Sequence, residues 1–131
     1  AALRVTDSPD EPARRDRDDL RLSVRLLPIM GPGKVQLLDM IERCGSIAAA
    51  ARAMGIAYPK AWKMVDSLNR HFERPLVIRA EEGKRGKAAE LTDAGRDVLR
   101  LFRAIEAKAQ TLFEPELDAL AAMLKATSGR S

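Results

Sequence analysis

Apolar and polar side chains alternate strictly where the patterned part of the chain begins. Between residues 20 and 26, leucine or valine occupies every second position, and arginine or serine occupies the positions between them. Because successive side chains of a strand point to opposite faces, this period of two predicts a half-buried strand. Pro28 and the Gly31-Pro32-Gly33 cluster should end it. We therefore expect an N-terminal strand before the first helix.

Two helices joined by a tight turn are predicted next. Residues 33–44 carry apolar side chains at helical spacing and end at Gly45, a residue suited to the left-handed conformation that closes a helix. Ser46 occupies the N-cap position of a second helix over residues 47–54, which contains five alanines. Because these side chains are small, a following helix can cross the second one closely.

A third helix is predicted over residues 59–72, after a turn at Gly55. Pro59 suits its first turn because the N–H that proline lacks would be unpaired there. The expected buried face consists of Ala61, Val65, Leu68 and Phe72, and the expected solvent face consists of Lys60, Lys63, Ser67 and Arg70.

A short hairpin with a basic tip is predicted after the third helix. Its two strands are expected at residues 76–79 and 89–91. The tip between them, at residues 81–87, holds two glycines and three basic residues, Lys84, Arg85 and Lys87. Such a tip can reach the phosphates of a nucleic acid, although charged hairpin tips are usually only solvated.

A long helix is predicted from Thr92 or Asp93 to about residue 113, before Pro115 breaks it and a short amphipathic piece begins. Its apolar positions repeat at spacings of four and three, as in the seam of a coiled coil. These positions are Val98, Phe102, Ile105, Ala109 and Leu112. We expect this seam to join two copies of the chain as a homodimer. The alternative is that it folds back onto its own domain.

Charge divides the chain into a tail and a body. The 131 residues carry a net charge of +4, but residues 1–19 hold six acidic residues, four arginines and two prolines, so the body carries +6. With little apolar surface to bury, residues 1–19 are predicted to be a disordered tail, and residues 127–131 a disordered end. Residues 20–91 are then expected to form one domain, and residues 92–126 the dimerisation helices.

The scarcity of reactive side chains argues against catalysis and metal binding. Cys44 is the only cysteine and His71 the only histidine, so we expect no disulfide, no zinc site, no catalytic pair and no cofactor. No apolar run approaches the roughly 18 residues of a spanning helix. The N-terminus also lacks the pattern of a secretory signal. We therefore expect a cytoplasmic protein that is not an enzyme and has no membrane partner.

The order of the predicted elements is that of a winged helix-turn-helix, a mainly helical α+β fold. In such a fold the third helix enters the major groove of DNA, about 12 Å wide, and the hairpin is the wing. The residues expected to bind DNA are Ser46, Tyr58, Pro59, Lys60, Trp62 and Lys63, with Lys84, Arg85 and Lys87 in the wing.

Two alternatives stay open at this point. Trp62 is as compatible with a core position as with a DNA contact, because it follows a residue expected to be buried. A helix-turn-helix can also be a docking surface for a protein that never binds DNA. Lys60, Lys63 and the basic hairpin favour double-stranded DNA, since a protein-docking surface would carry apolar side chains there.

A family resemblance rests on specific residues. The segment from Gly45 to Ile56, followed by Tyr58-Pro59-Lys60-Ala61-Trp62, resembles the N-terminal domain of the molybdate-responsive ModE-type regulators. The general pattern is shared with LysR-type helix-turn-helix domains, whereas the run from Tyr58 to Trp62 is the more specific ModE-like feature. The segment from Leu76 to Arg79, a glycine-containing wing, and Ala89-Glu90-Leu91-Thr92 with Gly95 extend the resemblance over about residues 20–115.

The resemblance implies a winged-helix dimer, paired by its long last helix, that regulates genes of metal uptake or metal enzymes, such as those for molybdate. It also implies DNA contacts at Tyr58, Pro59, Trp62 and Lys63, and wing contacts near the basic tip residues. Two features depart from the family: Ala57 stands where a capping serine is frequent, and the wing is more charged and less rich in glycine. Full-length members carry C-terminal molybdate-binding domains that these 131 residues do not include, so we expect no small-molecule effector to bind this chain.

Overall fold

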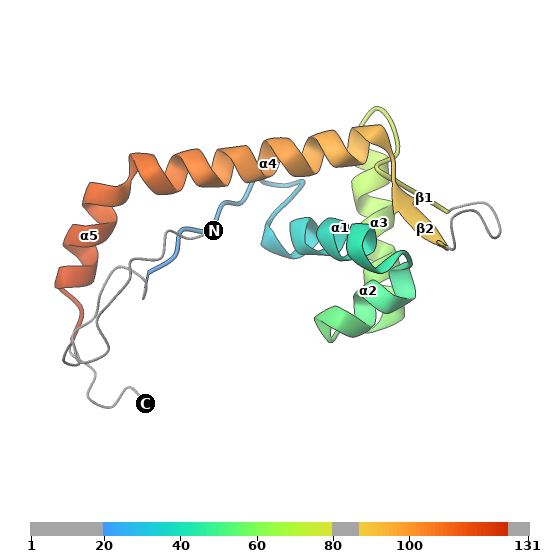
Figure 1. Cartoon of the computed structure of the whole chain (residues 1–131), viewed down its shortest axis with the longest axis horizontal. Coiled ribbons are helices and arrows are strands. Elements are labelled where there is room, and N and C mark those ends of the chain that lie inside the picture. The colour runs from blue at the N-terminus through green and yellow to red at the C-terminus, as the bar shows by residue number, and fades with distance from the viewer. Residues whose placement is uncertain (1–19, 80–86, 126–131) are drawn as a thin grey trace. The chain divides into compact units, whose positions relative to one another are not determined.

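The computed structural model describes residues 20–79 and 87–125 (Figure 1). The described residues divide into two compact units, one within Val24–Arg103 and one that combines residues 20–23 with residues 104–125. In chain order the elements are α1 (Pro32–Cys44), α2 (Ile47–Met54), α3 (Tyr58–His71), β1 (Val77–Arg79), β2 (Ala89–Leu91), α4 (Asp93–Leu112) and α5 (Glu114–Ala122). A mainly helical fold with one small antiparallel sheet is confirmed.

Three helices and the hairpin enclose the core of the Val24–Arg103 unit. The stripe predicted for α1 is buried, and α2 and α3 contribute mostly small side chains to the same cluster. The buried members are Met30, Val35, Leu37, Leu38, Ile41, Ile47, Ala50, Ala51, Ala61, Val65, Leu68, Leu76, Val77, Ala89, Leu91 and Phe102. Removing these apolar side chains from water is the main force that holds the unit together.

Local signals at the ends of α1 and α2 work as predicted. Gly45 and Gly55 close the two helices with φ of +80° and +71°, a left-handed conformation that glycine adopts without a steric penalty. The Ser46 hydroxyl oxygen accepts a hydrogen bond from the Ala49 N–H at 2.9 Å and so caps α2. The predicted bounds of α2 and β2 are confirmed. Those of α1 and β1 differ by one residue at the start, and those of α3 differ by one residue at each end.

The predicted N-terminal strand is wrong. Residues 20–25 form no ladder, and the described N-terminal segment holds only an isolated bridge between Leu26 and Met30. Those two residues bond to each other across a tight turn, with the Leu26 N–H donating to the Met30 carbonyl at 2.7 Å and the reverse bond at 2.9 Å. Burial does alternate along residues 20–25 as the pattern indicated. Alternating burial needs only an apolar neighbour, whereas a strand also needs a backbone partner.

Asn69 of α3 forms hydrogen bonds with the backbone at the start of the hairpin. In β1 and β2, Val77 lies opposite Leu91 and Arg79 opposite Ala89. The amide oxygen of Asn69 on α3 accepts from the Leu76 and Val77 N–H groups at 2.8 and 3.2 Å, and its NH₂ group donates to the Val77 carbonyl at 3.1 Å. Asn69 thus satisfies the backbone where β1 begins. Figure 1 shows this strand beside α3.

The second unit contains the end of α4 and α5. Pro115 lies in the first turn of α5, so the predicted break of the long helix is confirmed. Leu117 and Ala121 are buried, and the Leu22 N–H donates to the Gln110 side-chain oxygen at 3.4 Å. None of the helices in the described ranges is both long enough and apolar enough to span a membrane.

Candidate nucleic-acid interface

The turn between α2 and α3 brings two helices with small side chains together. Ala50 and Ala51 on α2 and Ala61 on α3 are buried in the same cluster. Their size allows the helix backbones to approach closely, and Gly55 turns the chain between them. The Ile56 N–H donates to the Ala51 carbonyl at 3.0 Å, which ties the turn back to α2. The helix-turn-helix geometry therefore follows from these small residues and this glycine.

The start of α3 is capped by backbone alone. Ala57 is the N-cap residue and offers no side-chain hydrogen bond, as its identity led us to expect. Its carbonyl accepts from the Lys60 and Ala61 N–H groups at 3.0 and 3.1 Å. Pro59 lies in the first turn and removes one donor that would otherwise need a partner. The positive end of the helix dipole is thus left open to a polyanion.

The predicted contact residues at the start of α3 lie on its surface. Tyr58 is 47% exposed, and Pro59, Lys60 and Lys63 are exposed as well. In the described part of the chain, neither lysine forms an ion pair. The exposed face at the start of α3 therefore carries two positive charges that are free to meet phosphates or base edges.

Trp62 combines the two roles that the sequence left open. Its side chain is half-buried and packs against the core cluster. The ring also meets the Tyr58 ring edge-on, with centroids 6.3 Å apart, and the guanidinium carbon of Arg79 lies 4.9 Å from its centroid. One part of the indole thus belongs to the core, while the remainder supports two exposed side chains.

The wing is anchored to the start of α2. The Gly45 carbonyl accepts from the Ala88 and Ala89 N–H groups at 2.8 and 3.0 Å. A Cβ at Gly45 would lie 3.4 Å from the Lys87 Cγ, so the half-buried Lys87 stem runs past the turn that precedes Ser46. The predicted residue Lys87 therefore lies beside Gly45, which directly precedes the predicted residue Ser46. Lys84 and Arg85 lie outside the described residues, and their role stays a prediction.

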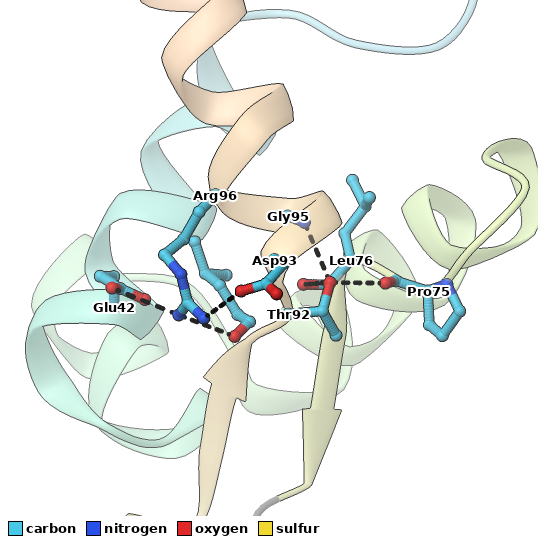
Figure 2. A network of polar contacts seen from close by, with 8 residues as sticks. Glu42, Pro75, Leu76, Thr92, Asp93, Gly95 and Arg96 are labelled. Carbon is cyan, nitrogen blue, oxygen red and sulfur yellow. Dashed lines mark hydrogen bonds and ion pairs between the residues drawn. The ribbon is translucent and has the colours of Figure 1, made fainter.

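A network of polar contacts joins the hairpin to α4 (Figure 2). The Thr92 hydroxyl donates to the Pro75 carbonyl at 2.8 Å and accepts from the Gly95 N–H at 2.9 Å, so that it caps α4. The Thr92 N–H donates to the Leu76 carbonyl at 2.9 Å. With Asn69 on the other side of β1, these bonds connect α3, the wing and the start of α4 within one unit.

Arg96 connects α4 to the core helices. It donates to the Leu91 carbonyl and to Asp93, both at 3.0 Å, and lies 3.8 Å from a Glu42 carboxylate oxygen on α1 (Figure 2). The hydrogen bond to Asp93 and the negative charge of Glu42 outweigh partial desolvation and raise the pKa of Arg96. Arg103 adds a 3.2 Å ion pair to Asp39 of α1. The first half of α4 is thus fixed to the unit that carries α3.

The predicted seam on α4 is divided between two faces. Phe102 is 2% exposed and belongs to the core, and Val98 packs against that core. The expectation that Phe102 contributes to an exposed seam is therefore wrong, because its side chain is buried in the core cluster. Ile105 and Leu112 are exposed, at 43% and 68%, and Ala109 is half-buried. Leu101, which was not predicted, is 53% exposed near Ile105 along the helix.

Three functional candidates were missed by the sequence pattern. Arg79 ends a short strand, and nothing local indicates that it reaches Trp62, seventeen positions earlier. Asn69 sits inside a helix, where an asparagine carries no pattern of its own. Leu101 falls outside the four-three spacing that selected Phe102. In the described residues, no group of three or more histidine, cysteine, aspartate or glutamate side chains could hold a metal ion.

Known proteins resemble this chain in the same region. Residues 33–96 match the bacterial regulatory helix-turn-helix proteins of the lysR family. The molybdenum transport protein ModE of Azotobacter vinelandii is 36% identical over 96 residues, which are 73% of this chain and 34% of that protein. The molybdenum-pterin-binding protein MopA of Rhodobacter capsulatus is 42% identical over 79 residues, or 60% of this chain and 30% of that protein.

Two further comparisons cover similar shares. The DNA-binding transcriptional dual regulator ModE of Escherichia coli K12 is 35% identical over 83 residues, or 63% of this chain and 32% of that protein. The crystal structure of ArgP from Mycobacterium tuberculosis aligns with 65% of this chain and 30% of that chain, at 23% identity and a TM-score of 0.48. The chain spans about a third of the length of the ModE and MopA relatives.

Proposed function

We propose that the chain binds double-stranded DNA in the cytoplasm and regulates transcription. The proposal is supported by the match of residues 33–96 to the helix-turn-helix proteins of the lysR family and by the similarity of the chain to ModE regulators. The observation that carries this proposal is the exposed start of α3. Lys60 and Lys63 project there without an ion pair among the described residues, beside the exposed Tyr58. Such a surface suits a polyanion and offers few apolar contacts to a protein partner.

The two parts of the interface have different tasks in this proposal. The start of α3 enters the major groove, where Lys63 and its neighbours reach base edges. Lys87 at the base of the wing, with Lys84 and Arg85 in its tip, neutralises phosphates alongside. Ser46 contributes indirectly as the cap that orients α2, next to the Lys87 stem.

We propose a homodimer as the binding form. An apolar stripe of Leu101, Ile105 and Leu112 is exposed on α4, and exposed apolar stripes of this kind mark protein interfaces. A second copy is the natural occupant, because a two-fold dimer presents two α3 helices to two half-sites. Such half-sites are spaced about 34–36 Å or a multiple of it. The preferred DNA should therefore be nearly palindromic.

The regulated genes are proposed to concern molybdenum. The support is in the relatives, two of which are named for molybdenum transport and for binding of a molybdenum pterin. Selection of binding sites from random duplexes, followed by mapping of the selected sequence onto the source genome, tests this proposal. Sites beside unrelated genes would contradict the proposed link to molybdenum and would leave the proposal of DNA binding unchanged.

Mobility shifts with the selected duplex and a random one test DNA binding directly. Replacing Lys63 by alanine should cost about 1–3 kcal/mol on the selected duplex and much less on the random one, because groove contacts discriminate bases. Replacing Lys87 should weaken both equally, because phosphate contacts carry no sequence information. Lys125→Ala is the matched control, since Lys125 is an exposed lysine that belongs neither to α3 nor to the wing nor to the proposed stripe on α4.

Two outcomes would contradict the proposal. No binding to any duplex at low salt would favour the protein-docking alternative for the α2–α3 surface. Equal affinity of the parent chain and the Lys63 variant for the selected duplex would show that α3 does not read the DNA. Circular dichroism confirms that each variant is folded before its binding is compared.

A further inference from the structure

Arg79 is an exposed cation that lies between the wing and the start of α3. It is the last residue of β1, opposite Ala89, at the base of the wing. Its guanidinium carbon lies 4.9 Å from the centroid of the Trp62 ring on α3. No acidic side chain in the described ranges pairs with it. A guanidinium within about 6 Å of an indole face is held by the ring electrons while its N–H donors stay available.

The indole that holds Arg79 is itself fixed. One part of Trp62 packs against the core cluster, and the ring meets Tyr58 edge-on with an interplanar angle of 87°. A side chain anchored in the core cannot swing away with the arginine. The exposed guanidinium is therefore positioned beside the first turns of α3, even though it belongs to the hairpin.

We propose that Arg79 binds a phosphate of the DNA backbone next to the groove that α3 enters, and that Trp62 is a positioning residue that holds Arg79 there. This inference rests on the proposed DNA binding. A planar guanidinium can donate two parallel hydrogen bonds to a phosphate, a geometry that an ammonium cannot form. Because Arg79 lies on β1 beside α3 and not on the helix proposed to enter the groove, we assign it to a backbone phosphate and not to base edges.

The test measures affinity for the selected and random duplexes by fluorescence anisotropy between 50 and 200 mM salt. Arg79→Ala should weaken both duplexes equally. Loss of one phosphate contact should reduce the magnitude of the slope of log K against log salt by about 0.9. When salt rises from 50 to 200 mM, the affinity of the variant should therefore fall by a factor about 3.5 times smaller than that of the parent. Arg79→Lys should keep most of the parental slope, and its affinity should lie between those of the parent and of Arg79→Ala. Arg100→Ala, which removes an exposed arginine of α4, should match the parent.

Two changes at Trp62 test the positioning role. Trp62→Phe keeps an aromatic face and should retain the parental slope. Trp62→Leu keeps apolar volume for the core but removes the ring, so it should reproduce the smaller slope of Arg79→Ala. The double variant Trp62→Leu/Arg79→Ala should then show no further change in slope. A merely structural Trp62 would change the melting temperature and leave the salt slope unaltered.

Distinct results overturn distinct claims. If the parent binds neither duplex, DNA binding fails and this inference fails with it. If the parent binds and Arg79→Ala keeps the parental slope, only the phosphate contact is wrong. If Arg79→Ala loses affinity for the selected duplex alone, Arg79 contacts a base. The proposed phosphate contact would then also be wrong. If Trp62→Leu keeps the parental slope, or weakens the selected duplex alone, Trp62 does not act through Arg79.

Discussion

At Gly95 the fold leaves no room for any side chain. A Cβ there would lie 2.2 Å from the Leu76 carbonyl oxygen and 3.0 Å from its carbon, and both are backbone atoms that cannot turn aside. The same carbonyl accepts the Thr92 N–H, so the start of α4 is pressed against the end of the segment leading into β1. The glycine is needed for this close approach and not for its own backbone angles.

Gly95→Ala should therefore destabilise the protein by about 1–3 kcal/mol, as overpacking of a tight contact does. Gly33→Ala is the matched control, because a Cβ at Gly33 would meet only the mobile Met64 Cε at 3.8 Å. Because alanine is a better helix former than glycine, Gly33→Ala should raise the free energy of unfolding by up to about 1 kcal/mol. Urea unfolding measures both free energies. Equal stability of the two variants would mean that α4 can move away from Leu76.

The two helices of the helix-turn-helix begin in different ways. Ser46 caps α2 through the N–H of Ala49, the third residue of that helix. At α3 the N-cap is Ala57, the second helical residue is Pro59, which has no N–H, and the N–H of Lys60 already donates to the Ala57 carbonyl. A serine at the α3 cap would therefore find only one donor, shared with the backbone.

Ser46→Ala should destabilise the protein by about 1 kcal/mol, because the Ala49 N–H loses its acceptor. Ala57→Ser should raise the free energy of unfolding by a few tenths of a kcal/mol at most, which is less than an alanine-to-serine change yields at an ordinary cap. Thermal unfolding of the two variants beside the parent measures both effects. A gain of a full kcal/mol at Ala57 would show that the Lys60 N–H prefers the hydroxyl to the carbonyl.

At the scale of the whole molecule, α4 serves two surfaces. Phe102 packs inward with the core, while Leu101, Ile105 and Leu112 face solvent in a single chain. The stripe proposed to join two chains thus consists of exposed side chains, whereas the residue that anchors α4 to its own unit is buried. Assembly and folding can therefore be disturbed separately.

The double variant Ile105→Glu/Leu112→Glu should sediment as a monomer at micromolar concentration, because two charges would be buried at the proposed interface. Ala107→Glu/Thr111→Glu adds the same charge at exposed positions of the same helix and should leave the dimer intact. Phe102→Ala should instead lower the free energy of unfolding by about 3–5 kcal/mol, through the cavity it leaves. A parent chain that sediments as a monomer would contradict the proposed dimer.

The helices and the hairpin, with their order along the chain, could be predicted from the sequence alone. The caps at Ser46, Gly45 and Gly55 act within four residues along the chain, so the ends of α1 and α2 could be predicted from neighbours alone. The exposed lysines of α3 followed from helical spacing for the same reason. These features need no knowledge of what packs against them.

Which side chains of these elements are buried, and which contact one another, depends on the tertiary structure. The alternation over residues 20–26 could not show that none of the described residues forms a strand beside it, and the spacing on α4 could not show that Phe102 points inward. Arg79 and Trp62 meet because the hairpin folds back beside α3. Each of these outcomes depends on residues that are distant in sequence, because burial and side-chain contacts are properties of the neighbours that the fold supplies.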